Sequence, residues 1–431
     1  MSSTYYGWRI VALASVALML TGPGQTIGMS VFVDEIVVDL DVSRSQVSLA
    51  YLIATLTSAA TLSFVGRGID RFGVRTAMTV IGIAFGFAIA GFAGVVGFGS
   101  MVVAFTLLRM LGQGALSLTA TTAVAQWFDR RRGFAVGTTT AVGAGLMSLV
   151  PVIFTAVIGL YGWRAGLLVI APVVSLLVIL IARFGIRNRP RDVGLAMEGG
   201  SLQDQEPEPD ETEEAANDSG ADREPRSPED HGVTGGEAMR TMMFWGLALV
   251  FASPSMISTG LMFHQLAVLG EQGLTATQAA VAFVPFSLAA MAVTFAGGAL
   301  VDRWSPKVML TIPTVMLIAA MNLVPHVTPG AMVLLYAVLL GGSSGSARSM
   351  EPTLMARFYG LAHVGAVRGR MMSFRVAASA LGPYALALGF EQFGAFGPAL
   401  RFLTVLPVAA LILLAFSPDP RHKRRSVQHN G

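Results

Sequence analysis

Four ionisable side chains, Arg109, His264, Arg348 and Glu351, lie inside apolar stretches of this 431-residue sequence. An ionised group deep in a bilayer costs roughly 2.5–3.5 kcal/mol on insertion scales, so such residues mark candidate functional sites. A guanidinium binds a carboxylate through two parallel hydrogen bonds, and histidine changes charge near neutral pH. The residue types therefore favour anion binding combined with proton transfer.

Arg109 begins a polar series in which Gln113, Ser117 and Thr121 follow at intervals of four residues. In a helix this spacing places the side chains on one face. We predict that Arg109 and Gln113 bind substrate at the wall of a cavity. The alternative is a structural arginine bonded to backbone carbonyls, and the pattern alone does not separate the two.

Arg348 and Glu351 are three residues apart, so they share a helix face and are expected to neutralise each other. If that face borders a cavity, Arg348 is a second substrate-binding residue and Glu351 carries a proton. His264 is a further candidate for proton coupling. Its alternative role is a hydrogen bond to water near the membrane surface.

Two apolar stretches are interrupted, one by Gly22-Pro23-Gly24 and the other by Ser253-Pro254-Ser255. Proline removes a backbone donor and bends a helix. Broken spans at corresponding places in two halves of a transporter mark its binding site. Gln25, beside the first break, is therefore a candidate uncharged ligand, with a simple packing kink as the alternative.

The composition places the whole chain in a membrane. Hydrophobic residues make up 53% of it and charged residues 13%, against about 25% charged in soluble domains. Apolar runs of the length that crosses a bilayer as helix recur twelve times. They are expected near residues 9–33, 46–66, 76–98, 100–125, 134–158, 164–184, 241–268, 276–300, 308–326, 330–355, 366–390 and 398–417.

The sequence contains an internal repeat. A basic string from Gly66 to Arg75 returns in weaker form from Gly298 to Lys307, 232 residues later. The same offset relates Gly28 to Gly260, Gln46 to Gln278, Gly133 to Gly365 and Gly137 to Gly369. We predict an all-α membrane protein with twelve transmembrane helices in two six-helix bundles related by a parallel repeat, which places a substrate site between the halves.

Charge divides the chain further. Residues 192–237 hold 15 of the 26 acidic residues and only 2 of the 29 basic ones, with few large apolar side chains. Such a segment cannot offset its own ordering entropy, so a disordered acidic linker is expected there. The predicted division is an N-terminal bundle at 1–191, the linker at 192–237, a C-terminal bundle at 238–418 and a basic tail at 419–431. Basic loops fall on one side of twelve alternating spans, which predicts a multi-pass protein of the cell membrane with both termini cytoplasmic.

Several chemistries are excluded. The chain has no cysteine, so disulfides and thiolate metal sites are ruled out. The six histidines show no metal-ligand spacing, no phosphate-binding Gly-x-x-x-x-Gly-Lys loop occurs, and no nucleophile recurs with a base and an orienting group. We therefore expect neither an enzyme nor a cofactor, metal or nucleic-acid partner. No obligate protein partner is evident.

The string from Gly66 to Arg75 matches the loop motif Gly-x-x-x-Asp-Arg-x-Gly-x-Arg and thereby resembles the major facilitator superfamily. In that superfamily the loop is a latch of the cytoplasmic gate. The resemblance implies gating roles for Asp70, Arg71 and Arg75 and, in the second copy, for Asp302 and Arg303. That copy has Ser305 and Lys307 in place of the second glycine and the last arginine.

Shorter strings are similar to the monocarboxylate transporter and oxalate/formate antiporter branch. They are Tyr6-Gly7-Trp8-Arg9, Gln126-Trp127-Phe128-Asp129-Arg130-Arg131-Arg132-Gly133, Tyr161-Gly162-Trp163-Arg164 and Arg357-Phe358-Tyr359-Gly360-Leu361-Ala362-His363-Val364-Gly365. The branch implies a secondary active transporter of a small organic anion, a monocarboxylate, by alternating access with proton symport or anion exchange. Its partners would be the carboxylate, protons or a counter-anion, and membrane lipid.

The chain departs from that branch in its charged residues: span 1 lacks a lysine, span 8 lacks aspartate and arginine, and span 11 lacks a central lysine. Two other functions stay open. One is a proton-coupled exporter of drugs or other amphiphiles. The other is a non-transporting membrane sensor of the same fold, with the acidic linker as its output segment.

Overall fold

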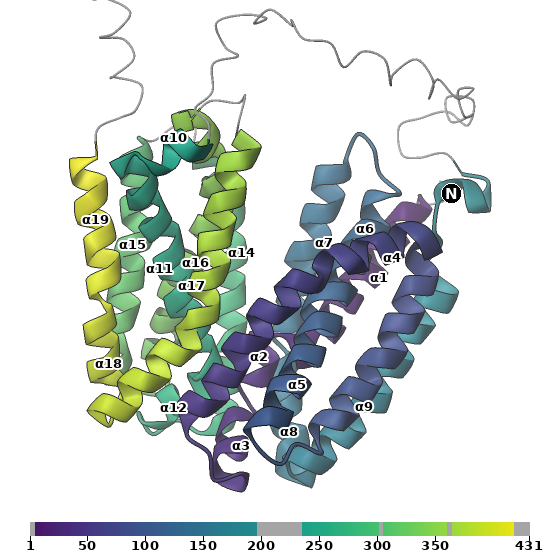
Figure 1. Cartoon of the computed structure of the whole chain (residues 1–431), viewed down its shortest axis with the longest axis horizontal. Coiled ribbons are helices and arrows are strands. Elements are labelled where there is room, and N and C mark those ends of the chain that lie inside the picture. The colour runs from purple at the N-terminus through teal and green to yellow at the C-terminus, as the bar shows by residue number, and fades with distance from the viewer. Residues whose placement is uncertain (1–4, 196–234, 301–304, 360–363, 418–431) are drawn as a thin grey trace, which may run out of the picture.

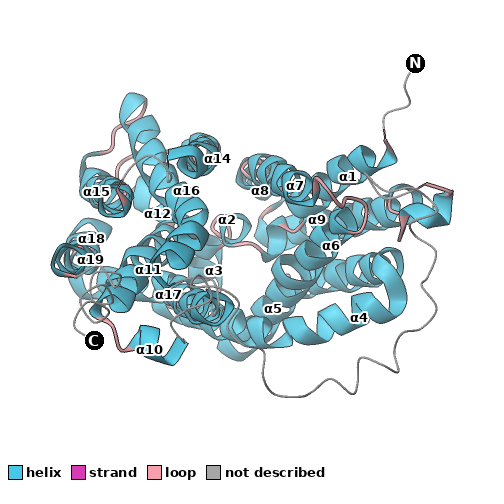
Figure 2. Ribbon diagram, turned by 90° about the horizontal axis from the view of Figure 1, so that it is seen from above, coloured by secondary structure: helices cyan, strands magenta, loops and turns pink. Residues whose placement is uncertain are grey.

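The computed structural model describes residues 5–195, 235–300, 305–359 and 364–417, and these residues form helices and no β-strand. The helices make two groups that stand side by side (Figure 1). Seen from above, α1 and α4 to α9 gather on one side and α11 to α19 on the other, with α2 and α3 between them (Figure 2).

The N-terminal half carries most of its apolar length in long helices joined by tight turns. Its elements are α1 (Tyr6–Leu20), the 3₁₀ turn η1 (Gly22–Gly24), α2 (Thr26–Met29), α3 (Val33–Asp39), α4 (Arg44–Phe92), α5 (Phe98–Leu108), the π-helix η2 (Arg109–Leu116), α6 (Ser117–Ala125), α7 (Arg132–Met147), α8 (Val150–Tyr161), α9 (Trp163–Leu180), η3 (Ile181–Gly185) and η4 (Pro190–Val193).

The C-terminal half is built in the same way. Its elements are α10 (Gly235–Met239), α11 (Met242–Phe263), α12 (Gln265–Gly270), α13 (Ala276–Val281), α14 (Phe283–Leu300), α15 (Pro306–Leu323), η6 (Val324–His326), α16 (Ala331–Tyr359), α17 (Val364–Phe393), α18 (Phe396–Leu403) and α19 (Val405–Phe416).

Nine helices among the described residues are long and apolar enough to cross a membrane, and two shorter apolar helices, Tyr6–Leu20 and Ala331–Ser346, accompany them. The remaining span is the first part of α4. This helix turns at Gly73, where φ is 77°, so one continuous element makes two crossings. The predicted architecture of twelve membrane helices in two six-helix bundles is thereby confirmed.

The two halves repeat local structure as well as sequence. Ser43 and Gln46 form a capping box at the start of α4, and Thr275 and Gln278 form the same box at the start of α13, 232 residues later. In each box the threonine or serine oxygen accepts the backbone N–H of the glutamine, which satisfies a free donor of the first turn. Gly162 and Gly394 share the same offset, with φ of 74° and 73°.

The two proline-containing breaks differ. In span 1, η1 separates α1 from α2 at Gly22–Gly24, as predicted. In span 7, α11 continues through Pro254, and the chain departs from the helix only at His264. Pro254 lies in the interior of α11, where it removes one backbone hydrogen bond without ending the helix.

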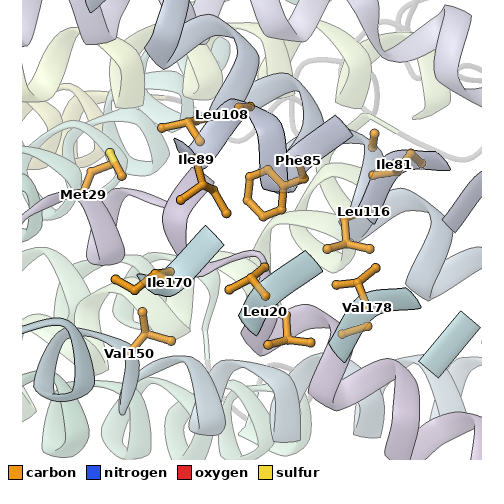
Figure 3. Packing of buried hydrophobic residues seen from close by; sticks show 14 of the residues in the cluster. Leu20, Met29, Ile81, Phe85, Ile89, Leu108, Leu116, Val150, Ile170 and Val178 are labelled. Carbon is orange, nitrogen blue, oxygen red and sulfur yellow. The ribbon is translucent and has the colours of Figure 1, made fainter. Parts of the chain in front are cut away.

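Among the described residues, buried side chains form one large apolar cluster in the N-terminal half and two smaller ones in the C-terminal half. Figure 3 shows part of the first, where Leu20, Phe85 and Leu108 from three different helices pack together. Phe263 of α11 belongs to this N-terminal cluster, although it lies in the other half of the sequence. The halves therefore share apolar packing near the end of α11.

The helix η4 (Pro190–Val193) ends, and α10 (Gly235–Met239) begins, within the range 192–237 that we assigned to the linker. The rest of that range, residues 196–234, and the tail at 419–431 lie outside the described residues.

Candidate functional site

Arg109 lies at the start of the π-helix η2 and is 4% exposed. Its guanidinium donates to the hydroxyl of Tyr51 on α4 and, at 3.4 Å, to the backbone carbonyl of Gly24 in η1. It also stands over the ring of Tyr51, 4.4 Å from the ring centre. No described carboxylate pairs with it, and its Nε has no acceptor. The site holds a buried cation surrounded by neutral groups.

The break in span 1 allows this arrangement. A side chain at Gly24 would overlap the carbonyl oxygen of Leu108, so only glycine permits η1 to approach the start of η2. The hydroxyl of Thr26, just after the break, bonds to that of Tyr51. Three helices thus meet around the Arg109 guanidinium.

The π-helix changes the register expected for span 4. The backbone hydrogen bonds of a π-helix span five residues instead of four, so η2 shifts the faces on which the following side chains lie. Arg109 is buried while Gln113 is exposed, so the predicted single polar face is not formed. Gln25 is half-buried, and its amide donates to the hydroxyl of Thr21 at 3.1 Å.

The described ion pair of Glu351 is with an arginine that we did not propose from the sequence. Glu351 of α16 is 4% exposed and accepts a hydrogen bond from Nη1 of Arg375 on α17. The expected partner Arg348 lies in α16, but its side chain is outside the described part of the chain. The expected neutralisation of Glu351 by Arg348 therefore lies outside the described residues. An arginine on the neighbouring helix neutralises the carboxylate because α16 and α17 lie side by side there.

Arg375 borders a cavity of about 190 Å³ between α11, α14, α16 and α17. Among the described residues, its polar lining includes Ser255, Ser258, Thr259, Ser344, Arg375 and Ser379. Pro254 and Ser255 line this cavity. The second predicted break therefore borders a polar site, although α11 is not broken there.

His264 occupies the contact between the halves. It is 1% exposed, and its Nε2 lies 3.2 Å from the hydroxyl of Ser48 on α4 and 3.0 Å from the carbonyl of Pro383 on α17. The alternative role, a hydrogen bond to water at the surface, does not fit this burial. One side chain of the C-terminal half instead contacts both halves.

More contacts between the halves surround His264. The ring of Tyr51 lies 4.5 Å from that of Phe263, and the backbone N–H of Ser45 donates to Glu391 at 2.9 Å. The guanidinium of Arg44 lies over the rings of Phe390 and Phe396. We call this region, formed by residues 44–51, 263–264 and 383–396, the joined end.

The joined end lies opposite α10 in the molecule, near α3 and α12 (Figure 1). Two of its residues also bond to an acid of their own half. Arg44 forms an ion pair with Asp34 at 2.6 Å, and the backbone N–H of Phe396 donates to Glu271 at 3.2 Å. Partial burial raises the pKa of Glu271, while the N–H of Phe396 and the charge of Arg44 act to lower it.

Comparisons with known proteins agree with this architecture. Residues 13–383 match the sequence profile of the Major Facilitator Superfamily. The chain is a member of this superfamily. It is similar in fold to the crystal structure of a bacterial homologue of the human lysosomal transporter Spinster, in an inward-facing and occupied conformation, with a TM-score of 0.64 and 16% sequence identity over 96% of both chains. The inward-facing, unoccupied structure of a bacterial Spinster homologue gives a TM-score of 0.63 at the same identity and coverage. No curated protein sequence matches the chain.

Membership of the superfamily identifies the chain as a multi-pass membrane protein and a secondary transporter that works by alternating access. In the superfamily's loop motif, Gly73 makes the turn, with φ of 77°. The guanidinium of Arg75 donates to the carbonyl of Arg183 at 2.7 Å. The exposed Arg71 stacks on its neighbour Phe72.

Asp70 is exposed and makes no ion pair or hydrogen bond with the described residues. Its role in gating is thus not visible in this conformation. Asp302 and Arg303 of the second copy lie outside the described residues.

Sequence reasoning missed Thr26, Ser48, Tyr51 and Arg375. Arg375 lies nine residues inside the eleventh predicted span, a depth that would have identified it by the rule that identified Arg109. The uncharged residues carried no comparable signal.

Proposed function

We propose that the chain transports a small organic anion, a monocarboxylate, across the cell membrane. The observation that carries the proposal is Arg109, a buried guanidinium with neutral partners and no described carboxylate. A buried charge is stable only when it is paired or well hydrogen-bonded. A carboxylate in transit supplies the missing negative charge and an acceptor for Nε.

Glu351 and Arg375 provide a route to proton coupling. While Glu351 is ionised it neutralises Arg375. When Glu351 takes up a proton, the charge of Arg375 becomes available to the substrate anion, so proton and anion are carried together. Without the proton step, the same arginine exchanges one anion for another. This assigns to Arg375 the part that the sequence suggested for Arg348.

The contacts at the joined end indicate to which side of the membrane the present conformation is open. Basic loops favour cytoplasmic termini, which places the joined end on the outer side. The outer gate is then closed, held by His264, Arg44 and Glu391, as expected of an inward-facing transporter. Asp70, which makes no ion pair or hydrogen bond with the described residues, fits the same state. In the superfamily its loop closes the cytoplasmic gate, which is open in an inward-facing transporter.

The test is counterflow of labelled L-lactate in proteoliposomes, with pyruvate and formate as competitors and with or without a pH gradient. Arg109→Gln should abolish counterflow, and Arg109→Lys should weaken it, since a lysine lacks the planar fork that binds a carboxylate twice. Arg401→Gln, which changes an exposed arginine of α18, is the control and should retain activity. Counterflow by Arg109→Gln with the parental KM would contradict the assignment.

The same liposomes address the other functions. An exporter would move cationic amphiphiles such as ethidium and no small acid. A sensor would move neither. Deleting residues 200–230 should leave counterflow intact, because the transport residues named above all lie outside that segment.

A further inference from the structure

The cavity beside Arg375 carries more hydroxyl groups than a bare carboxylate needs. Five of its lining residues are serines or threonines, contributed by α11, α16 and α17. Carboxylate binding requires charge, whereas a set of hydroxyls can donate to and accept from a ligand that itself carries hydroxyl groups. The composition of the lining therefore bears on which acid fits.

Four of these hydroxyls are held in pairs across helices. Ser258 of α11 lies 2.7 Å from Ser344 of α16, and Thr259 of α11 lies 2.8 Å from Ser379 of α17, each measured between the hydroxyl oxygens. In such a pair one hydroxyl donates and the other keeps its own hydrogen. Each pair thus retains one donor and several lone pairs, at a position fixed by two helices.

Arg375 has unused donor capacity on the same cavity. Its Nη1 donates to Glu351, while its Nη2 lies 3.1 Å from the sulfur of Met372. A thioether is a weak acceptor, and a carboxylate oxygen that replaced it would form a charge-assisted hydrogen bond. Nη2 can therefore take a ligand carboxylate while Nη1 keeps its bond to Glu351, and protonation of Glu351 leaves the guanidinium charge to that ligand.

We propose that this cavity is a subsite for hydroxylated short-chain acids. The ligand carboxylate binds Nη2 of Arg375, and its hydroxyl groups bind the Ser258–Ser344 and Thr259–Ser379 pairs. The cavity volume of about 190 Å³ is large enough for a three-carbon acid with two hydroxyls. This inference rests on the proposed anion transport and specifies its substrate class.

The two hydroxyl pairs should make the cavity select acids that carry hydroxyl groups. An acid without hydroxyls displaces water from the cavity and leaves the hydroxyl pairs without partners. A site built to bond a substrate hydroxyl discriminates strongly against the analogue that lacks it, and here we expect a factor on the order of 10 or more.

The test compares D-glycerate with propionate as competitors of glycerate counterflow in proteoliposomes. The two acids have the same carbon number and one carboxylate, and they differ in two hydroxyl groups. The parent should prefer glycerate by about 10-fold or more. The double variant Ser344→Ala, Ser379→Ala, which removes one hydroxyl from each pair, should lose most of this preference by weakening glycerate while propionate is unchanged.

Two controls keep the result interpretable. Thr314→Ala removes a buried hydroxyl of α15 that bonds to Leu310 of its own helix and does not line the cavity, so the preference should persist. The double variant Ser344→Thr, Ser379→Thr keeps the hydroxyls and should keep the preference, whereas misfolding of the alanine variant would weaken competition by both acids. Equal competition by both acids in the parent, or an unchanged ratio in the alanine variant, would overturn the subsite alone. If the parent moves neither these acids nor lactate, the proposed anion transport fails with it.

Discussion

Two buried tyrosines allow the Arg109 site to be tested residue by residue. The hydroxyl of Tyr51 accepts from Arg109 and bonds to Thr26, whereas the buried hydroxyl of Tyr336 has no described partner. A hydrogen bond to a charged group contributes about 1.5–3 kcal/mol. Tyr51→Phe should therefore lower the melting temperature of the purified protein and raise the KM for the transported acid.

Tyr336→Phe is the matched control for this experiment. It removes the same atom from an equally buried ring, and because that hydroxyl is desolvated without a partner, stability should be unchanged or higher. Equal losses of stability in the two variants would show that the Tyr51 hydroxyl has no special relation to Arg109.

Glu351 is the residue on which proton coupling depends in this account. Glu351→Gln keeps the shape of the side chain and cannot ionise, so acid-driven accumulation should fall to the level seen without a pH gradient. Exchange of one acid for another should persist. Proton entry measured with an internal pH dye checks the first expectation, and Glu35→Gln, at an exposed acid of α3, is the control. Parental proton-driven uptake by Glu351→Gln would exclude this carboxylate.

At the scale of the helices, the close crossing of α11 and α17 positions the hydroxyl cavity. A side chain at Gly382 would overlap the carbonyl oxygen of Met256 on α11, while one at Gly369 of the same helix would meet nothing within 4 Å. Gly382→Ala should therefore cost roughly 1–3 kcal/mol by overpacking and reduce transport, because it separates Arg375 and Ser379 from α11. Gly369→Ala should be neutral or stabilising by about 0.5–1 kcal/mol. Thermal unfolding in detergent compares the two, and equal melting temperatures would contradict the close packing.

The elements themselves were largely predictable from sequence. Membrane spans follow from apolar length, and the repeat follows from matched residues such as Gln46 and Gln278, whose capping boxes are local and independent of distant contacts. The π-helix at Arg109 was not predictable, because it depends on packing against η1. It separates Arg109 from Gln113 and so changes the expected polar face.

Contacts between helices could not be predicted from the sequence either. Spacing within one helix favoured Arg348 as the partner of Glu351, but nothing in the sequence places Arg375 of α17 beside α16. For the same reason His264 was placed near a surface, whereas it is buried between Ser48 and Pro383 of opposite halves. Buried charges can be found from sequence, while their partners are set by the assembly of the helices.

At the scale of the whole molecule, the central claim is that the two bundles alternate between closure at the joined end and closure at the opposite end. The absence of cysteine from the chain means that spin labels attach only at introduced cysteines. One pair, Val38 of α3 with Phe393 of α17, reports on the joined end. Another, Phe134 of α7 with Arg370 of α17, reports on the opposite end. All four side chains are exposed, so labelling should not disturb the core.

Pulsed electron paramagnetic resonance on these two pairs, in lipid nanodiscs with and without a transported acid at low pH, is the most direct test. The account predicts that the acid adds longer distances between Val38 and Phe393 and shorter distances between Phe134 and Arg370. Distances that remain unchanged in both pairs under every condition, or that lengthen together, would contradict alternating access in this protein.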